Sequence, residues 1–199
     1  MPSTGRAVAT ALAAVGVGLG TARGRGRRLD DRLFERINAD LSSPALDVAF
    51  RVVTEAGSIW ASAGAATALA GRRRGAVAVD AFGAACAMWI VGQLMKKAFR
   101  RLRPYETEPE RLRLLINRPS GASWPSSHPA VLATFVTVAA RDLDLDPRAR
   151  AALAALVVAV AASRVYLGVH YPADVLGGLL LSRALADLWS AEISPRVLR

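Results

Sequence analysis

Apolar runs long enough to form membrane helices recur along this chain, and clusters of basic residues follow several of them. Residues 7–22 are uncharged and precede RGRGRR, residues 52–71 precede RRR, and residues 76–95 precede KK. With 53% hydrophobic residues and a mean hydropathy of +0.29, the 199 residues are too apolar for an ordinary soluble domain. Backbone groups in lipid must be hydrogen-bonded within the chain, and no strand-like alternation is visible. The sequence therefore predicts an all-α, integral membrane helix bundle.

We expect six membrane helices in one domain that spans residues 1–199. The expected spans are residues 7–22, 52–71, 76–95, 129–140, 151–162 and 173–189. The first run is shorter than the usual span of about 20 residues, and a cleaved signal peptide remains an alternative for it. Residues 29–53 carry apolar side chains at helical spacing among charges, which predicts an amphipathic helix on the membrane surface. Residues 1–50 would then form an N-terminal helix with an interfacial segment, and residues 52–190 the core helices.

The formal net charge of +10 points to a membrane surface as partner. Basic clusters beside apolar runs suit the headgroups of a phospholipid bilayer, whereas nucleic-acid binders carry such clusters on a soluble face. We therefore expect a multi-pass protein of the cell membrane, that of a bacterium, and no nucleic-acid partner. The count of basic residues at each end favours a cytoplasmic site, but the RRR turn favours the opposite side, so the orientation stays open. Cys86 is the single cysteine, so no disulfide framework is possible.

Both histidines of the chain lie in polar segments between apolar runs. Six alternating spans would place the connections after the first, third and fifth spans at the same side of the membrane. Residues 96–103, 123–128 and 164–174 fall in or beside the last two of these connections. Three separate segments would therefore bring their polar side chains to one face, where we expect a site.

The side chains of these segments indicate that the site binds an anion. Lys96, Arg103 and Arg164 can surround one phosphate, and arginine donates to phosphate in a bidentate manner. Ser126 and Ser127 precede the helix expected from residue 129, so hydroxyl groups and unpaired backbone N–H groups would point at the same anion.

The two imidazoles supply the reactive groups in this interpretation. HYPAD, residues 170–174, has the pattern of a helix start, with Pro172 at the first position. Asp174 can then fold back toward His170 and fix its tautomer. An oriented His170 is a competent nucleophile, and His128 can protonate the leaving oxygen.

Two other interpretations of these residues stay open. The serines and prolines could simply cap helices while the arginines mark membrane interfaces, although both histidines would then lie in these segments by accident. His128, His170 and Asp174 could instead bind zinc, although three basic residues around them would repel a divalent ion. The remaining cations of the first segment, Lys97, Arg100 and Arg101, are interpreted as interfacial charges.

The spacing of these residues resembles a known three-part signature. Lys96 is followed after six residues by Arg103 and Pro104, PSSH occupies residues 125–128, and Ser163 and Arg164 precede His170 and Asp174. This pattern resembles the type 2 phosphatidic acid phosphatase superfamily, which includes membrane lipid phosphate phosphatases, soluble class A acid phosphatases and vanadium haloperoxidases. The apolar spans favour the membrane branch.

The resemblance implies a role for each matched residue. By analogy His170 attacks phosphorus to form a phosphohistidine, Asp174 supports it, and His128 acts as acid and then as base. Lys96, Arg103, Ser126 and Arg164 would hold the phosphate, and Ser127 would add an amide or hydroxyl donor. No metal and no other cofactor is implied. The second motif usually has glycine where this chain has Ser127, which could crowd the pocket.

The resulting hypothesis is a metal-independent phosphatase for a membrane lipid phosphate. Phosphatidic acid, phosphatidylglycerol phosphate and polyprenyl phosphates or diphosphates are the expected substrate types. The alternative is a membrane protein that binds lipid phosphates without turnover because Ser127 has disabled catalysis. The sequence does not specify the lipid tail or the oligomeric state.

Overall fold

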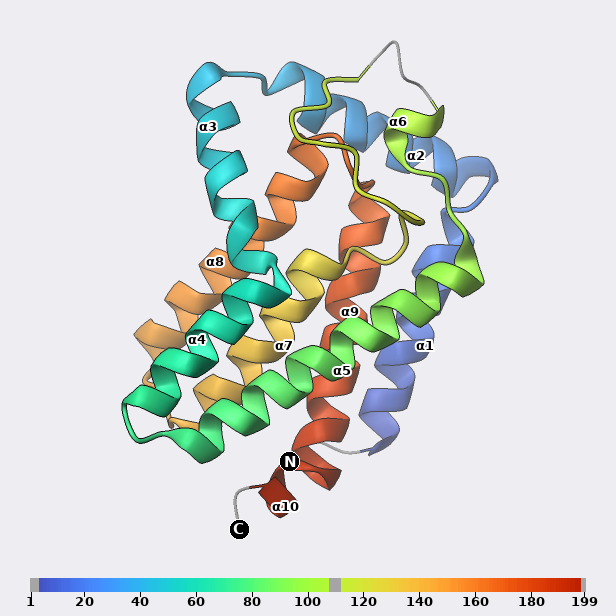
Figure 1. Cartoon of the computed structure of the whole chain (residues 1–199). Coiled ribbons are helices and arrows are strands. Elements are labelled where there is room, and N and C mark those ends of the chain that lie inside the picture. The colour runs from blue at the N-terminus through green and yellow to red at the C-terminus, as the bar shows by residue number, and fades with distance from the viewer. Residues whose placement is uncertain (1–3, 108–111, 198–199) are drawn as a thin grey trace.

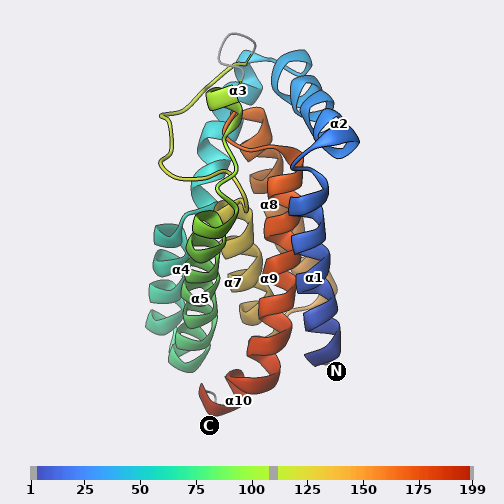
Figure 2. The same ribbon diagram turned by 90° about the vertical axis from the view of Figure 1, so that its right-hand side faces the viewer.

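The computed structural model describes residues 4–107 and 112–197, and in these residues every regular element is helical. Six helices form the bundle (Figures 1 and 2). Their bounds are α1 Thr4–Gly20, α4 Ile59–Gly71, α5 Gly75–Phe99, α7 Ser127–Asp142, α8 Pro147–Tyr166 and α9 Pro172–Glu192. Shorter elements connect or extend them: α2 Gly24–Glu35, a π-helical turn Arg36–Asp40, α3 Pro44–Val53, a 3₁₀ turn Thr54–Gly57, α6 Pro104–Thr107 and α10 Ser194–Val197. The predicted all-α helix bundle is confirmed.

Small side chains let the central helices approach closely. Helix α7 lies in the middle of the bundle, with α4 and α5 on one side and α9 on the other, and α1 covers α9 (Figure 2). Ala81, Ala84 and Ala85 of α5 pack against Val131 and Phe135 of α7. Helices that associate in lipid are enriched in such small residues at their contacts.

The prediction of one amphipathic helix over residues 29–53 is wrong. Helix α2 turns by 88° from α1 and lies across one end of the bundle, and the chain then unwinds before α3 runs down beside α8 (Figure 1). Pro44 is the first residue of α3, and the Ser43 hydroxyl accepts the backbone N–H of Leu46 at 3.5 Å. Proline at a first helical position behind a serine cap starts a new helix.

The expected span over residues 52–71 is also interrupted. The 3₁₀ turn Thr54–Gly57 separates α3 from α4, and the Ser58 hydroxyl caps α4 by accepting the N–H of Ala61 at 3.0 Å. Helix α4 has 13 residues, so it is short for a span. Among the described residues, Gly75–Thr107 and Pro147–Tyr166 are long and apolar enough to cross a membrane, and the bent pair Thr4–Gly20 and Gly24–Asp40 would be a third. The expected count of six spans is therefore approximate.

Charged residues within the apolar helices have partners. Asp80 of α5 is fully buried and accepts hydrogen bonds from Trp189 Nε1 at 2.8 Å and from Arg141 Nη2 at 2.7 Å. Arg183 of α9 donates to Asp187 at 3.1 Å. Ionisable groups in apolar helices are costly unless they are paired in this way.

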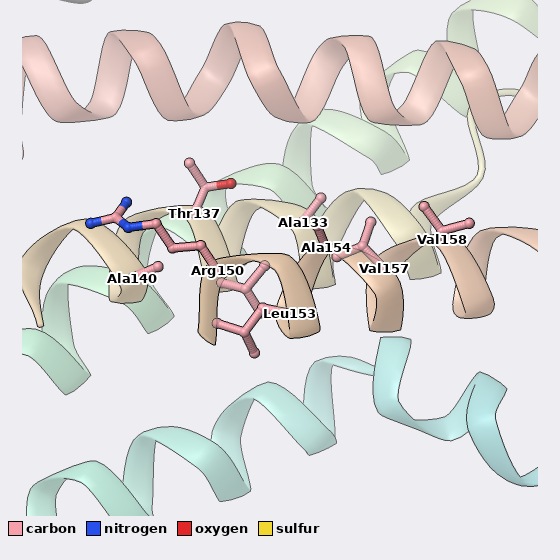
Figure 3. A pocket seen from close by; sticks show the side chains of 9 residues that line it. Ala133, Thr137, Ala140, Arg150, Leu153, Ala154, Val157 and Val158 are labelled. Atoms are coloured by element: carbon pink, nitrogen blue, oxygen red, sulfur yellow. The ribbon is translucent and has the colours of Figure 1, made fainter. Parts of the chain in front are cut away.

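An apolar groove of about 340 Å³ runs along the outside of α7 and α8 (Figure 3). Alanine and valine side chains line most of it, and Arg150 lies at one end. Exposed apolar surface of this kind is expected where a membrane protein contacts acyl chains.

The polar segments meet at one end of the bundle, as the sequence predicted. The last turns of α5 and α8 and the first turns of α7 and α9 lie toward the end that α2 covers (Figure 1). Residues 112–126 form an irregular segment over this end (Figure 1).

Candidate active site

A cavity of about 510 Å³ opens at the end where the polar segments meet. Six of the eight residues that the sequence predicted for the site line it: Lys96, Arg103, Ser127, His128, Arg164 and His170. They come from α5, α7, α8 and the two connections beside them. Ser126 and Asp174 lie behind the wall and are fully buried. We call this space the site cavity.

His170 lies between a cation and a buried carboxylate. Its Nε2 is 3.3 Å from Arg103 Nη1, and its Nδ1 is 3.6 Å from Asp174 Oδ2. A guanidinium group can only donate, so Nε2 is the acceptor and the proton belongs on Nδ1, toward Asp174. Burial, together with the positive charges of Arg103, Arg164 and Lys96, lowers the pKa of His170 well below its usual value. The imidazole is therefore neutral at physiological pH, and its Nε2 lone pair becomes available for attack when Arg103 Nη1 donates to a bound anion instead of to Nε2.

Asp174 is fixed by several donors. Its Oδ2 accepts the backbone N–H of Tyr171 at 2.8 Å and the hydroxyl of Ser123 at 2.5 Å. Ser123 Oγ is also 3.4 Å from His170 Nδ1, so this hydroxyl lies close to both groups. The distance from Asp174 to His170 exceeds a normal hydrogen bond. Asp174 therefore lies toward His170 as the sequence predicted, but Ser123 was missed.

Arg103 is held in place by backbone carbonyl groups. Its Nε donates to the carbonyl of Gly121 at 2.8 Å and its Nη1 to that of Val169 at 3.0 Å. The side chain is 1% exposed. Because its orientation is fixed before any ligand binds, Arg103 presents a preorganised positive charge to the site cavity.

Several buried donors around the site cavity have no hydrogen-bond partner among the described residues. They are the hydroxyl groups of Ser126 and Ser127 and the Nε of Arg164. Arg164 Nη1 donates to the Thr54 hydroxyl at 2.7 Å, which holds this side chain from the 3₁₀ turn. Buried polar groups are nearly always satisfied, so unpaired donors beside cationic side chains indicate where an anion binds.

Two glycines make room for the start of α7. A Cβ on Gly57 would lie 2.8 Å from His128 Cβ, closer than real side chains approach. A Cβ on Gly92 would lie 3.1 Å from Ser127 Oγ, so the missing side chain at Gly92 of α5 leaves space for this serine. The extra side chain of Ser127 is thus accommodated against α5, and its hydroxyl remains at the wall of the site cavity.

A buried ion-pair chain behind His170 was not predicted from the sequence. Arg101 Nη1 donates to Asp174 Oδ1 at 2.8 Å, and its Nη2 donates to Asp30 Oδ2 of α2 at 2.5 Å. Asp30 Oδ1 also accepts the backbone N–H of Ala173 at 2.9 Å. The interpretation of Arg101 as an interfacial charge is wrong, since its side chain is 8% exposed. Helix α2 thereby reaches the carboxylate beside His170.

Tyr171 joins the same cluster. The guanidinium groups of Arg27 and Arg101 both lie over its ring, each 4.5 Å from the ring centroid. Its hydroxyl accepts a hydrogen bond from Arg27 Nη2 at 2.7 Å. Cations over an aromatic face are attracted to it. These contacts bind α2 to the first turn of α9.

Comparison with known proteins identifies the family. A model of the PAP2 superfamily matches residues 77–194, which include every motif described above. This chain belongs to the PAP2 superfamily. The undecaprenyl-diphosphatase of Sulfolobus acidocaldarius is 33% identical over 101 residues, which cover 50% of this chain and 47% of that protein. The match therefore spans about half the length of this relative.

Solved structures of the superfamily share the fold. A transmembrane PAP2-type phosphatidylglycerolphosphate phosphatase from Bacillus subtilis superposes with a TM-score of 0.75 over 94% of each chain, at 19% identity. The LpxE of Aquifex aeolicus superposes with a TM-score of 0.71 over 82% of this chain and 95% of its own, at 25% identity. The apolar helices and this likeness to a transmembrane protein indicate a PAP2 protein of a membrane.

Proposed function

We propose that this chain is a metal-independent phosphatase that hydrolyses a phosphate monoester or diphosphate of a membrane lipid. The observation that carries the proposal is the site cavity itself, where unpaired cationic and hydroxyl donors surround two imidazoles. Membership in the PAP2 superfamily supports it. The proposed location is the plasma membrane of a bacterium, with the bilayer as the source of the substrate.

In the first step, Nε2 of His170 attacks the phosphorus of the bound phosphate. Burial, with the positive charges of Arg164, Lys96 and Arg103, lowers the pKa of His128 to about 3 without substrate, so His128 must take up a proton together with the phosphate, whose negative charge offsets those cations. The N–P bond then forms as the bond between phosphorus and the leaving oxygen breaks, and the His128 imidazolium gives its proton to that oxygen. Arg103, Arg164 and Lys96 offset the charge of the phosphoryl oxygens. Asp174 stabilises the positive charge that develops on the His170 ring, as carboxylates do beside catalytic imidazoles.

In the second step, water attacks the phosphohistidine. His128, now unprotonated, takes a proton from the water, and the N–P bond breaks to release inorganic phosphate and neutral His170. This step uses the same phosphate-binding groups, because the phosphoryl group remains in the site cavity.

The mouth of the site cavity suits a lipid. Ile59 and Trp60 at the start of α4 and Trp89 of α5 line it, and Trp60 is 82% exposed. Tryptophan is enriched at the headgroup level of membranes. A lipid whose phosphate reaches His170 would therefore place its tail beside α4 and α5. The relatives named above act on undecaprenyl diphosphate and phosphatidylglycerolphosphate, which makes lipids of these classes the first candidates here.

Phosphate release in the presence of chelator tests the function. The protein, purified in neutral detergent with EDTA, is expected to release inorganic phosphate from a lipid phosphate at the rate measured without EDTA. A rate that EDTA abolishes and zinc restores would contradict the proposal and support the zinc interpretation.

Replacing Ser127 by glycine separates the enzyme from a non-catalytic lipid-phosphate binder. Because the serine fits against Gly92, we expect the phosphatase activity of Ser127→Gly to stay within about threefold of wild type. Glycine early in α7 should cost about 0.5–1 kcal/mol of stability, which thermal unfolding measures. A wild type that binds without turnover, together with a Ser127→Gly variant that hydrolyses the lipid, would establish the alternative.

Replacing Asp30 by asparagine tests whether α2 positions the reacting histidine. Loss of the carboxylate should let Arg101 and Asp174 shift, and misplacement on the scale of 1 Å can cost about 10²-fold in rate. We expect kcat to fall about 10- to 100-fold while KM changes little, since Asp30 does not line the site cavity.

The matched control for this variant is the neighbouring Asp31→Asn. Asp31 pairs with Arg27 on the same helix, and its side chain is 28% exposed. Partly exposed pairs on neighbouring turns of one helix contribute only about 0.2–0.5 kcal/mol, so this variant should keep its kcat within about twofold of wild type. Equal losses in both variants would mean that α2 merely stabilises the fold.

A further inference from the structure

A second pocket, of about 450 Å³, adjoins the site cavity along the last turns of α5. Gln93 and Lys96 line both spaces. We call it the basic pocket, and its remaining lining residues are Lys97, Arg100, Arg101, Leu102, Glu106, Gly121 and Ala122. A group bound there would lie beside whatever occupies the site cavity, with Lys96 between them.

Two of the charged residues of the basic pocket are already engaged. Arg101 donates to Asp30 and Asp174, so two carboxylates offset its charge. The Glu106 carboxylate accepts the backbone N–H of Arg103 at 2.6 Å. Lys96, Lys97 and Arg100 remain, and none of them has a carboxylate within ion-pair distance among residues 4–107 and 112–197. The basic pocket is therefore net positive.

Stabilisation of the helix end does not account for all of these charges. Arg100 ends α5 in the left-handed conformation, with φ of 50°, and its Nε donates to the carbonyl of Lys97 at 3.2 Å. This contact uses one of the five N–H donors of the guanidinium group. The remaining donors of Arg100 and the ammonium group of Lys97 can bind an anion in the basic pocket.

We propose that the basic pocket binds a second phosphate group of the substrate while the reacting phosphate occupies the site cavity. The preferred substrate class is then lipids with two neighbouring phosphate groups, lipid diphosphates above all. Two adjacent phosphates repel each other strongly unless cations lie around and between them, and Lys96 lies on the boundary between the two spaces. Arg100 can donate to phosphate in a bidentate manner, and Lys97 adds a point charge. This inference rests on the function proposed for the site cavity.

Binding measured without turnover tests the basic pocket. In a His170→Gln background, isothermal titration in neutral detergent would compare a C15 prenyl diphosphate with the C15 prenyl monophosphate. Adding Lys97→Gln and Arg100→Asn should weaken the diphosphate at least about tenfold and the monophosphate less than about twofold. Asparagine is chosen because it tolerates the left-handed conformation. Equal weakening of both ligands, or of neither, would overturn the proposal.

The matched control is Arg72→Gln with Arg73→Asn at the opposite end of the bundle. These changes also remove two charges from the end of an apolar helix, and Arg73 has a φ of 60°. They should leave both affinities unchanged, and a loss equal to that of the basic-pocket variant would reveal a general charge effect and overturn the proposal.

Repeating the titration with excess phosphatidylglycerol distinguishes a substrate phosphate from a bilayer headgroup. If phosphatidylglycerol abolishes the preference of the unmodified pocket for diphosphate, the pocket holds a headgroup and the proposal is overturned. If instead the wild-type protein releases no phosphate from either prenyl compound while the binding preference persists, the phosphatase function fails and the basic pocket is supported as a diphosphate-binding site.

Discussion

Phosphate release from a lipid phosphate is expected to fall by about 10⁴-fold or more when His170 is replaced by glutamine. Removal of a nucleophile from a catalytic site has effects of this order, and each factor of ten corresponds to about 1.4 kcal/mol of activation free energy. Glutamine nearly preserves the side-chain volume, but its amide cannot form the N–P bond. Release of inorganic phosphate at saturating lipid measures the loss.

Covalent labelling ties that loss to the proposed intermediate. Wild-type protein mixed with a ³²P-labelled lipid and quenched in alkali should carry one labelled phosphohistidine, a linkage that survives alkali and is lost in acid. His170→Gln should carry no label, yet it should bind the lipid and unfold at a temperature close to that of wild type. Label that persists in His170→Gln would assign the nucleophile to another residue and contradict the mechanism.

The sequence predicted which residues come together in the candidate site because these residues lie at helix ends with clear signals. Pro172 begins α9, Lys96 lies in the last turn of α5, and His128 lies in the first turn of α7. The order of the apolar runs determines which helix ends lie at the same side of the membrane. The convergence of the three motifs could therefore be predicted from chain order alone, without knowledge of the packing.

The residues that hold Asp174 and His170 in place could not be predicted in the same way. Asp30 and Arg101 lie among other charged residues whose pattern is that of solvent-exposed side chains, and only the 88° turn after α1 brings α2 over α9. Ser123 lies in the polar segment 123–128 but precedes the second motif, and nothing in the sequence pairs it with Asp174. Pairings between segments that are distant in sequence depend on the angle between helices, which a hydropathy pattern does not specify.

The interruption of the expected span over residues 52–71 has a local physical cause that the hydropathy pattern does not show. Glu55 and Gly57 interrupt an otherwise apolar run. The 3₁₀ turn there places the Thr54 hydroxyl within hydrogen-bond distance of Arg164 and places Gly57, which has no side chain, against His128. A hydropathy pattern records the run as continuous. The interruption serves the site, because the turn supplies one wall of the site cavity through Gly57.

Replacing His128 by alanine should produce the second largest effect, and its size should depend on the leaving group. For a lipid monophosphate whose leaving group is an alkoxide, we expect kcat/KM to fall about 10²- to 10⁴-fold, the usual contribution of general acid catalysis. An aryl phosphate releases a phenolate, which is a far weaker base and needs no proton in the transition state. With that substrate the first step should slow by less than about tenfold.

Hydrolysis of the phosphohistidine, the second step, provides a stricter test of the role of His128. Hydrolysis of the phosphohistidine needs a base for water, so His128→Ala should accumulate the labelled intermediate with the aryl phosphate even though the intermediate forms readily. Ser120→Ala is the matched control, because Ser120 also lines the site cavity and its side chain has no assigned role; it should affect both substrates equally and slightly. Equal losses on the alkyl and aryl substrates in His128→Ala would mean that His128 only binds phosphate. A selective loss with trapped label places proton transfer on His128 and nucleophilic attack on His170.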